Sequence, residues 1–201
     1  MARFIIPRFL DWRRKGRDEV RPQETDAPQN PGEPEQTDST RNKQPTETTM
    51  KPMTPGITKA GDGMEGITWN ILGQIYVPKQ LCEASFSWHA TFPTGTFVPP
   101  HIHPTQDEFI YMLEGRLDLI LDGQKTFAEP GDTIRLPRGI PHGIFNHSED
   151  KAKCVFWVAP SQRLYDLFWA LHNLGPEADP AEVVAVSAQH EVDFLPPPEE
   201  E

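Results

Sequence analysis

The side chains best suited to metal chemistry lie close together near the middle of the chain. His101 and His103 are two residues apart, and Glu108 follows them. In an extended chain, residues two apart project from the same face, so both imidazoles point to one side. Glu108 opens an apolar run in which alternation places Ile110 and Met112 on its own side. A carboxylate at the head of an apolar strand needs a partner.

A third imidazole comes from a second segment of the chain. His142 follows a turn rich in glycine and proline that begins at Gly131. Three neutral imidazoles and one carboxylate suit a borderline divalent ion, and we expect iron first, with manganese, nickel, copper or zinc as alternatives. Such ions accept about five or six ligands, which leaves positions for water, dioxygen or substrate.

These two segments resemble the two sequence motifs of the cupin superfamily. Residues 95–115 match G-x5-H-x-H-x4-E-x6-G, and residues 131–146 match G-x5-P-x-G-x2-H-x3-N. Only residues 116–130 separate the motifs, a short spacing that is usual in small microbial cupins. Two motifs in the correct order are far more specific than one.

The resemblance implies a fold, a ligand set and an activity. The expected fold is all-β, an antiparallel jelly-roll β-barrel with C-terminal helices and a disordered N-terminal segment. The implied metal ligands are His101, His103, Glu108 and His142, and Glu108 would also take a proton from the substrate. The chain is similar to small single-domain cupins described as quercetin 2,3-dioxygenase-like. Flavonol-cleaving members commonly have two domains, so the single motif pair leaves the substrate open.

The surrounding sequence independently predicts short β-strands. Residues 84–92 have the two-residue period of a half-buried strand, with the apolar side chains Phe86, Trp88, Ala90 and Phe92 on one face. Other runs predicted as strands are residues 67–72, 74–77, 108–113, 117–121, 124–128, 131–136, 143–146 and 154–159. Many short strands separated by glycine and proline indicate a barrel or a sandwich.

The period changes to that of a helix after residue 160. Leucine and phenylalanine side chains fall on one stripe between Leu164 and Leu174, with Ser161 as the expected N-cap and Gly175 as the terminator. A second helix is predicted after Asp179, its expected cap. We expect both helices to pack against the outside of the barrel.

The predicted organisation is a single cupin domain over residues 61–195, with the barrel at 66–160 and the helices at 161–190. Residues 1–60 are predicted to be a disordered extension, because residues 21–55 contain almost no apolar side chain. Residues 196–201 are a tail. Whether residues 1–49 are a dispensable extension or precede the native start is left open.

Composition excludes several classes of partner. The formal net charge is -11, and residues 51–201 carry ten basic against twenty-one acidic side chains, which argues against nucleic acid. No apolar stretch is long enough to span a bilayer, so no membrane association is expected. Cys82 and Cys154 have no metal-site or disulfide spacing, which favours a reducing compartment, and we expect a cytoplasmic protein.

Together these features predict a mononuclear metal-dependent dioxygenase acting on a small enol or phenolic substrate. The alternative is a non-oxidative cupin, either a metal-dependent isomerase or a small-ligand-binding protein. The expected pocket residues are Ile110, Met112 and Ile144, in phase with Glu108 and His142. The expected partners are a small-molecule substrate, dioxygen and a second copy of the chain in a homodimer.

Overall fold

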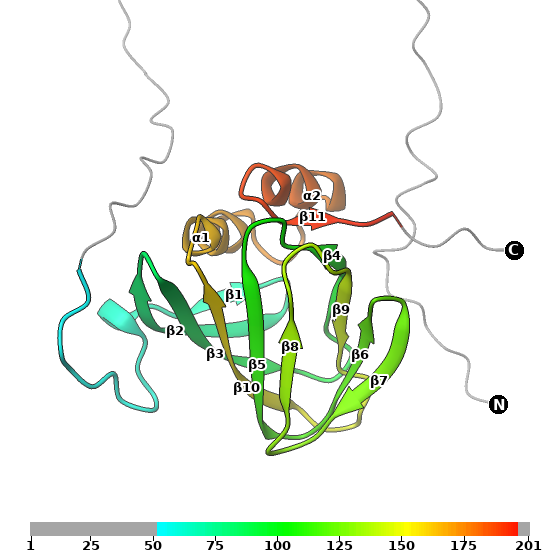
Figure 1. Ribbon diagram of the computed structural model, residues 1–201, viewed down its shortest axis with the longest axis horizontal. Helices are drawn as coiled ribbons and strands as arrows, with labels where there is room; N and C mark the ends of the chain where they lie inside the picture. Colours follow the sequence, from blue (N-terminus) through cyan, green and yellow to red (C-terminus); the bar gives the residue numbers. More distant parts are fainter. Residues whose placement is uncertain (1–51, 197–201) are drawn as a thin grey trace, which may run out of the picture. The chain divides into compact units, whose positions relative to one another are not determined.

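The computed structural model describes residues 52–196, in which two antiparallel β-sheets form a jelly-roll barrel (Figure 1). The first sheet contains, in spatial order, β1 (Trp69–Ile71), β2 (Gln74–Cys82), β3 (Ser85–Phe92), β10 (Ala152–Ala159), β5 (Asp107–Glu114) and β8 (Thr133–Leu136). The second contains β11 (Asp193–Phe194), β4 (Phe97–Ile102), β9 (His142–Phe145), β6 (Leu117–Leu121) and β7 (Gln124–Ala128). The predicted all-β antiparallel fold is confirmed.

The predicted extension falls largely outside the described residues. Residues 1–51 and 197–201 lie beyond them, and residues 52–60 contain no helix or strand and are exposed. A single turn of 3-10 helix, η2 (Met64–Gly66), precedes the first strand. The single-domain organisation stays a prediction.

The inner face of the first sheet is buried and rich in aromatic side chains. β3 and β10 both alternate strictly between buried and partly exposed residues, and several of the buried ones are aromatic. Trp88 and Phe156 are paired across the two strands, and their rings stack with centroids 5.1 Å apart. The predicted inward set on β3 is confirmed, since Phe86, Trp88, Ala90 and Phe92 are all buried. Burying each large apolar side chain contributes about 2 kcal/mol, so this layer is a major part of the core.

The sequence predicts no strand at the position of β4 and only the first part of β2, because both strands contain proline. β4 includes Pro99 and Pro100, which lie where its pairing with β9 is irregular, between Val98 and His101. β2 continues through Pro78 to Cys82, with a similar irregularity after Pro78. Proline cannot donate to the sheet, and an irregular position is where a strand tolerates it.

Residues 52–196 contain two α-helices, α1 (Leu164–Leu174) and α2 (Pro180–Ala188), and Figure 1 shows them together at one end of the sheets. The expectation that they cover the outside of the barrel is wrong for α1. Phe168 contacts the inward-facing aromatic side chains, with ring centroids 5.0 Å from Trp88 and 5.8 Å from Phe86. α1 therefore closes over the interior, because its apolar stripe and the inner face of the first sheet bury each other.

The helix ends agree with the sequence at two of the three predicted positions. Gly175 ends α1 with a positive φ of 81°, and the Asp179 carboxylate accepts the Ala181 N–H at 2.8 Å at the start of α2, which Pro180 begins. The Ser161 cap was wrong. Its hydroxyl donates to the carbonyl oxygen of Glu83 instead, and α1 begins after Arg163. Neither helix, nor any other in residues 52–196, is long and apolar enough to cross a membrane.

Candidate metal centre

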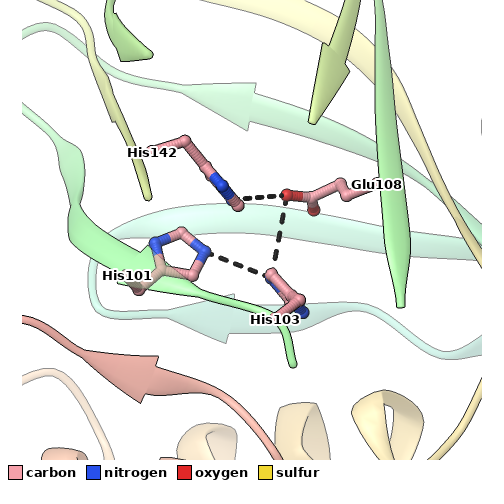
Figure 2. Close-up of side chains that lie close together, drawn as sticks. All are labelled: His101, His103, Glu108 and His142. Atoms are coloured by element: carbon pink, nitrogen blue, oxygen red, sulfur yellow. Dashed lines mark hydrogen bonds and ion pairs between the residues drawn. The ribbon is translucent and has the colours of Figure 1, made fainter. Parts of the chain in front are cut away.

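The four predicted ligands converge from both sheets. β4 and β9 are antiparallel neighbours in which His101 lies opposite His142, and His103 follows directly after β4. Glu108 is the second residue of β5, in the other sheet. Figure 2 shows the four side chains pointing toward one another between the sheets.

The spacing of these atoms is that of a ligand set for one ion. The Nε2 atoms of His101 and His103 are 3.2 Å apart, and Nε2 of His142 is 3.1 Å from Oε2 of Glu108. One possible ligand atom from each residue lies within 4.8 Å of all the others, and all four residues are buried. Metal–nitrogen and metal–oxygen bonds of about 2.0–2.2 Å place neighbouring ligand atoms roughly 3–4 Å apart. This His/Glu cluster can therefore hold a metal ion.

The Nδ1 atom of each imidazole forms a hydrogen bond that fixes the orientation of the ring. The Nδ1–H of His101 donates to the Pro99 carbonyl oxygen at 2.8 Å, and that of His142 to the Ile140 carbonyl oxygen at 3.0 Å. The Nδ1–H of His103 donates to Oε1 of Gln106 at 3.1 Å. We assign this tautomer from the acceptors, which are all oxygens, and it is the arrangement usual behind metal-ligating histidines.

This tautomer leaves three bare Nε2 lone pairs and a carboxylate facing one another in a buried space. Electron-rich atoms at 3.1–3.7 Å repel unless a proton or a cation lies among them. A divalent ion would remove the repulsion at all four atoms at once. The donor set therefore fits a transition metal better than a plain hydrogen-bond network.

Burial also favours the protonation state that binds metal. It holds the pKa of His101 well below the ordinary 6.5, and the neighbouring imidazoles of His142 and His103 lower it further. Burial likewise lowers the pKa of His103, although the Glu108 carboxylate acts in the opposite direction. Neutral imidazoles are the form that ligates a metal.

Gln106 is not predicted from the sequence as a site residue, although its side chain orients His103. It is fully buried, and its Nε2 donates to the carbonyl oxygens of Pro160 at 3.0 Å and Ser161 at 2.6 Å. With both amide hydrogens engaged, only its oxygen can face His103. Its position in the sequence between His103 and Glu108 could have indicated a role at the site, but a polar residue in a loop is ordinarily exposed.

Replacing Gln106 with alanine should weaken metal binding about 10–100-fold, the usual cost of removing a group that orients a metal-ligating histidine. Without its acceptor, the His103 ring is free to rotate and to change tautomer. Competition with a coloured chelator would measure the affinity. Gln80→Ala, which removes a hydrogen-bonded glutamine that belongs to neither the cluster nor the cavity wall, is the matched control. Equal affinities in the two variants would show that Gln106 does not orient the site.

A cavity of about 60 Å³ lies beside the cluster. His101, His103 and Glu108 lie along it, and most of its other lining side chains are apolar. The C-terminal part of the chain contributes a large share of the wall, through Leu167, Phe168, Leu171, Ser187, Val192 and Phe194. The Phe194 ring lies 5.6 Å from that of His101, because β11 pairs with β4 at this residue.

The structure separates the three predicted pocket residues. Ile144 lines the cavity, whereas Ile110 and Met112 are not among its lining residues. Both are buried in the core, where Ile110 pairs with Phe156 on one side and Ile134 on the other. The strands on either side of β5 fill the space around them.

Two further polar residues in the wall were not singled out in the sequence. The Tyr76 O–H donates to Oε1 of Gln74 at 2.7 Å, and the Gln74 amide donates to the Phe97 carbonyl oxygen at 2.8 Å. Burial raises the pKa of Tyr76 well above 10.0, and the Glu108 carboxylate raises it further. Tyr76 is therefore a protonated, already paired phenol. Their two-residue spacing in the predicted strand 74–77 was the available signal.

Comparison with known families places the cluster inside one recognised domain. Residues 88–158 match the family model described as the cupin domain. The matched segment contains all four residues of the cluster and the strands from which they come.

Individual relatives also match over part of the chain. The tetracenomycin polyketide synthase protein TcmJ of Streptomyces glaucescens is 30% identical over 77 residues, which are 38% of this chain and 52% of that protein. Quercetin 2,3-dioxygenase of Bacillus subtilis is 40% identical over 48 residues, 24% of this chain and 14% of that protein. The chain spans about half the length of the first curated relatives it matches. An RmlC-like cupin from Shewanella frigidimarina superposes with a TM-score of 0.49 at 15% identity, covering 56% of this chain and 96% of that one.

Proposed function

We propose, from the premise that this chain contains a cupin domain, that it is a mononuclear metal-dependent dioxygenase acting on a small enol or phenolic substrate. His101, His103, Glu108 and His142 would hold the metal, with iron the first expectation and manganese, nickel, copper or zinc the alternatives. The observation that carries the proposal is a buried His/Glu cluster that borders an apolar cavity.

When bound, such a metal supplies Lewis-acid chemistry toward an oxygen-bearing substrate, and every candidate metal except zinc also supplies one-electron chemistry toward dioxygen. The rest of the work belongs to this chain. The apolar wall excludes water and favours a hydrophobic substrate, and burial lowers the pKa of His101 and His103, which favours their neutral form. An enol or phenol would bring its hydroxyl oxygen to the cluster and its carbon skeleton to the wall.

Glu108 is the proposed proton acceptor. It is the only carboxylate among the residues that line the cavity, and it is almost fully buried. The other acidic group there, the Tyr76 phenol, is protonated and already donates to Gln74. A substrate hydroxyl proton would therefore pass to a carboxylate oxygen of Glu108.

The size of the cavity favours a small substrate over a flavonol. Pockets for drug-sized ligands measure about 300–1,000 Å³, several times more than the 60 Å³ here. The aromatic side chains of Phe168 and Phe194 reduce the space. We therefore expect short enols or single-ring phenols.

A non-oxidative role is the second candidate. Two relatives that match over 77 residues carry polyketide synthase names, whereas the relative named as a dioxygenase matches over 48. Polyketide chains are rich in enolisable carbonyl groups, which the same cluster could bind without consuming dioxygen. An isomerase or a binding protein for such a molecule would use the same ligands.

Oxygen consumption separates the two candidates. Protein purified without chelators would first be analysed by elemental mass spectrometry, and an oxygen electrode would then follow its reaction with small diketones and single-ring phenols. We expect uptake that depends on the metal and falls at least about 100-fold per bound metal in Glu108→Gln, since proton transfer contributes about 10²–10⁴-fold. A metal-loaded protein that leaves the trace flat with every compound would favour the non-oxidative candidate.

Pairing of two copies and a cytoplasmic location remain predictions from the sequence. Tyr111 and Leu113, on the outer face of β5, are each 41% exposed and offer an apolar contact surface for a second copy. A monomeric mass by light scattering would contradict the pairing.

A further inference from the structure

Two side chains in the cavity wall carry a buried polar atom that lacks a partner. Ser187 on α2 is 0% exposed and Trp88 on β3 is 1% exposed, and both line the cavity. Neither Oγ of Ser187 nor Nε1 of Trp88 has a hydrogen-bond partner among the described residues. Most buried polar groups in native proteins are paired, so unpaired ones beside a cavity point to a ligand.

The local structure does not supply the missing partner for Ser187. A serine within a helix commonly donates to the carbonyl oxygen one turn earlier, but this hydroxyl does not. The carbonyl oxygen of Ser187 is already used, since it accepts the N–H groups of His190 at 2.9 Å and Val192 at 3.1 Å. These bonds turn the chain from α2 toward β11 and leave the hydroxyl at the cavity wall.

The chemistry of the two groups limits what they can recognise. An indole N–H only donates, and a serine hydroxyl can donate or accept. An oxygen that accepts a hydrogen bond satisfies either group, whereas a hydrocarbon satisfies neither. The neighbouring wall is apolar, and Phe168 contacts Trp88 with ring centroids 5.0 Å apart.

We propose that Ser187 and Trp88 recognise an acceptor oxygen on the substrate other than the oxygen that the His/Glu cluster would bind. The inference rests on the proposed function and narrows the substrate class. The substrate is a small, mostly apolar enol or phenol that carries a second oxygen, such as an ether or a carbonyl, beyond its metal-binding end.

Two matched probes test this recognition directly. 1-Methoxypentane-2,4-dione and heptane-2,4-dione share the same enolising diketone and the same length, and differ only by an ether oxygen in place of a methylene. Calorimetry without oxygen, on the metal-loaded full chain, would measure binding without turnover. The unmutated protein should prefer the methoxy compound about tenfold, the effect of one or two hydrogen bonds.

Variants then assign the preference to the two side chains. Ser187→Ala and Trp88→Phe should each reduce it about threefold or more by lowering the affinity for the methoxy compound alone. Trp69→Phe is the matched control, because Trp69 is also fully buried with an unpaired Nε1 but does not line the cavity. It should keep the preference of the unmutated protein.

A stability measurement excludes a purely structural role for Ser187. Burying an unpaired hydroxyl is unfavourable, so Ser187→Ala should raise the thermal midpoint by about 2–4 °C while it lowers selectivity. A lower midpoint with an unchanged preference would overturn the proposal.

The outcomes also separate this proposal from the function on which it rests. Equal binding of both probes would overturn the proposed recognition of a second oxygen by Ser187 and Trp88, and would leave the metal-dependent function standing. Failure of the metal-loaded protein to bind either diketone would overturn the proposal of an enol substrate, and with it the recognition of a second oxygen.

Discussion

Replacing both His101 and His142 with alanine is expected to abolish stoichiometric metal binding. The two imidazoles lie opposite each other on neighbouring strands, with ring centroids 4.3 Å apart, and supply half of the cluster. Losing a residue that merely orients a ligand costs about 10–100-fold in affinity, so losing two direct ligands should cost more. Elemental mass spectrometry of protein purified without chelators would measure the metal per chain.

A second readout does not depend on purification. A ligand that binds only the folded state stabilises it by about 2.7 kcal/mol when present at 100 times its dissociation constant. A chelator should therefore lower the thermal midpoint of the unmutated protein and leave that of the double variant unchanged.

The control for this experiment also removes two histidines. His147 lies on the surface near Asp118, and His172 accepts the N–H of Asn70 through its Nδ1. His147→Ala combined with His172→Ala should retain the metal. Equal metal content in the two double variants would show that the His/Glu cluster is not the binding site.

Gly115→Ala is expected to destabilise the fold by about 3 kcal/mol. Gly115 has a φ of +74°, and an added Cβ would lie 2.6 Å from the Lys151 carbonyl oxygen and 2.9 Å from the Ala152 Cα. Both neighbours are backbone atoms of the segment that enters β10, so they cannot move aside as a flexible side chain would. Left-handed strain of about 1–2 kcal/mol and overpacking of about 1–3 kcal/mol act together.

Gly123→Ala measures the left-handed backbone strain without the steric contact. Gly123 has a φ of +76°, almost the same as Gly115, but nothing lies within 4 Å of its added Cβ. It should cost about 1–2 kcal/mol from strain alone. Urea denaturation would give both free energies of unfolding. Equal losses in the two variants would rule out steric contact as the reason for glycine at position 115.

Parts of the barrel could be predicted from local pattern. Alternation identified the inward face of β3, and a two-residue spacing identified the common face of His101 and His103. β4 itself was harder to predict, because Pro99 and Pro100 argue against a strand unless the partner strand is known. β11 is shorter still, and only its pairing with β4 makes it a strand.

The sequence by itself determined the four residues of the His/Glu cluster, the antiparallel β architecture and the existence of both helices. The strands and helices depend on the two-residue period of a strand and the 3.6-residue period of a helix, whereas the antiparallel barrel and the ligand set are implied by the resemblance to the cupin motifs. Only the tertiary structure decided that Gln106 supports His103, that α1 closes over the interior and that Ser187 and Phe194 line the cavity. These contacts join residues that are distant in sequence or oriented by a loop, and no periodicity along the chain encodes which buried surfaces will meet.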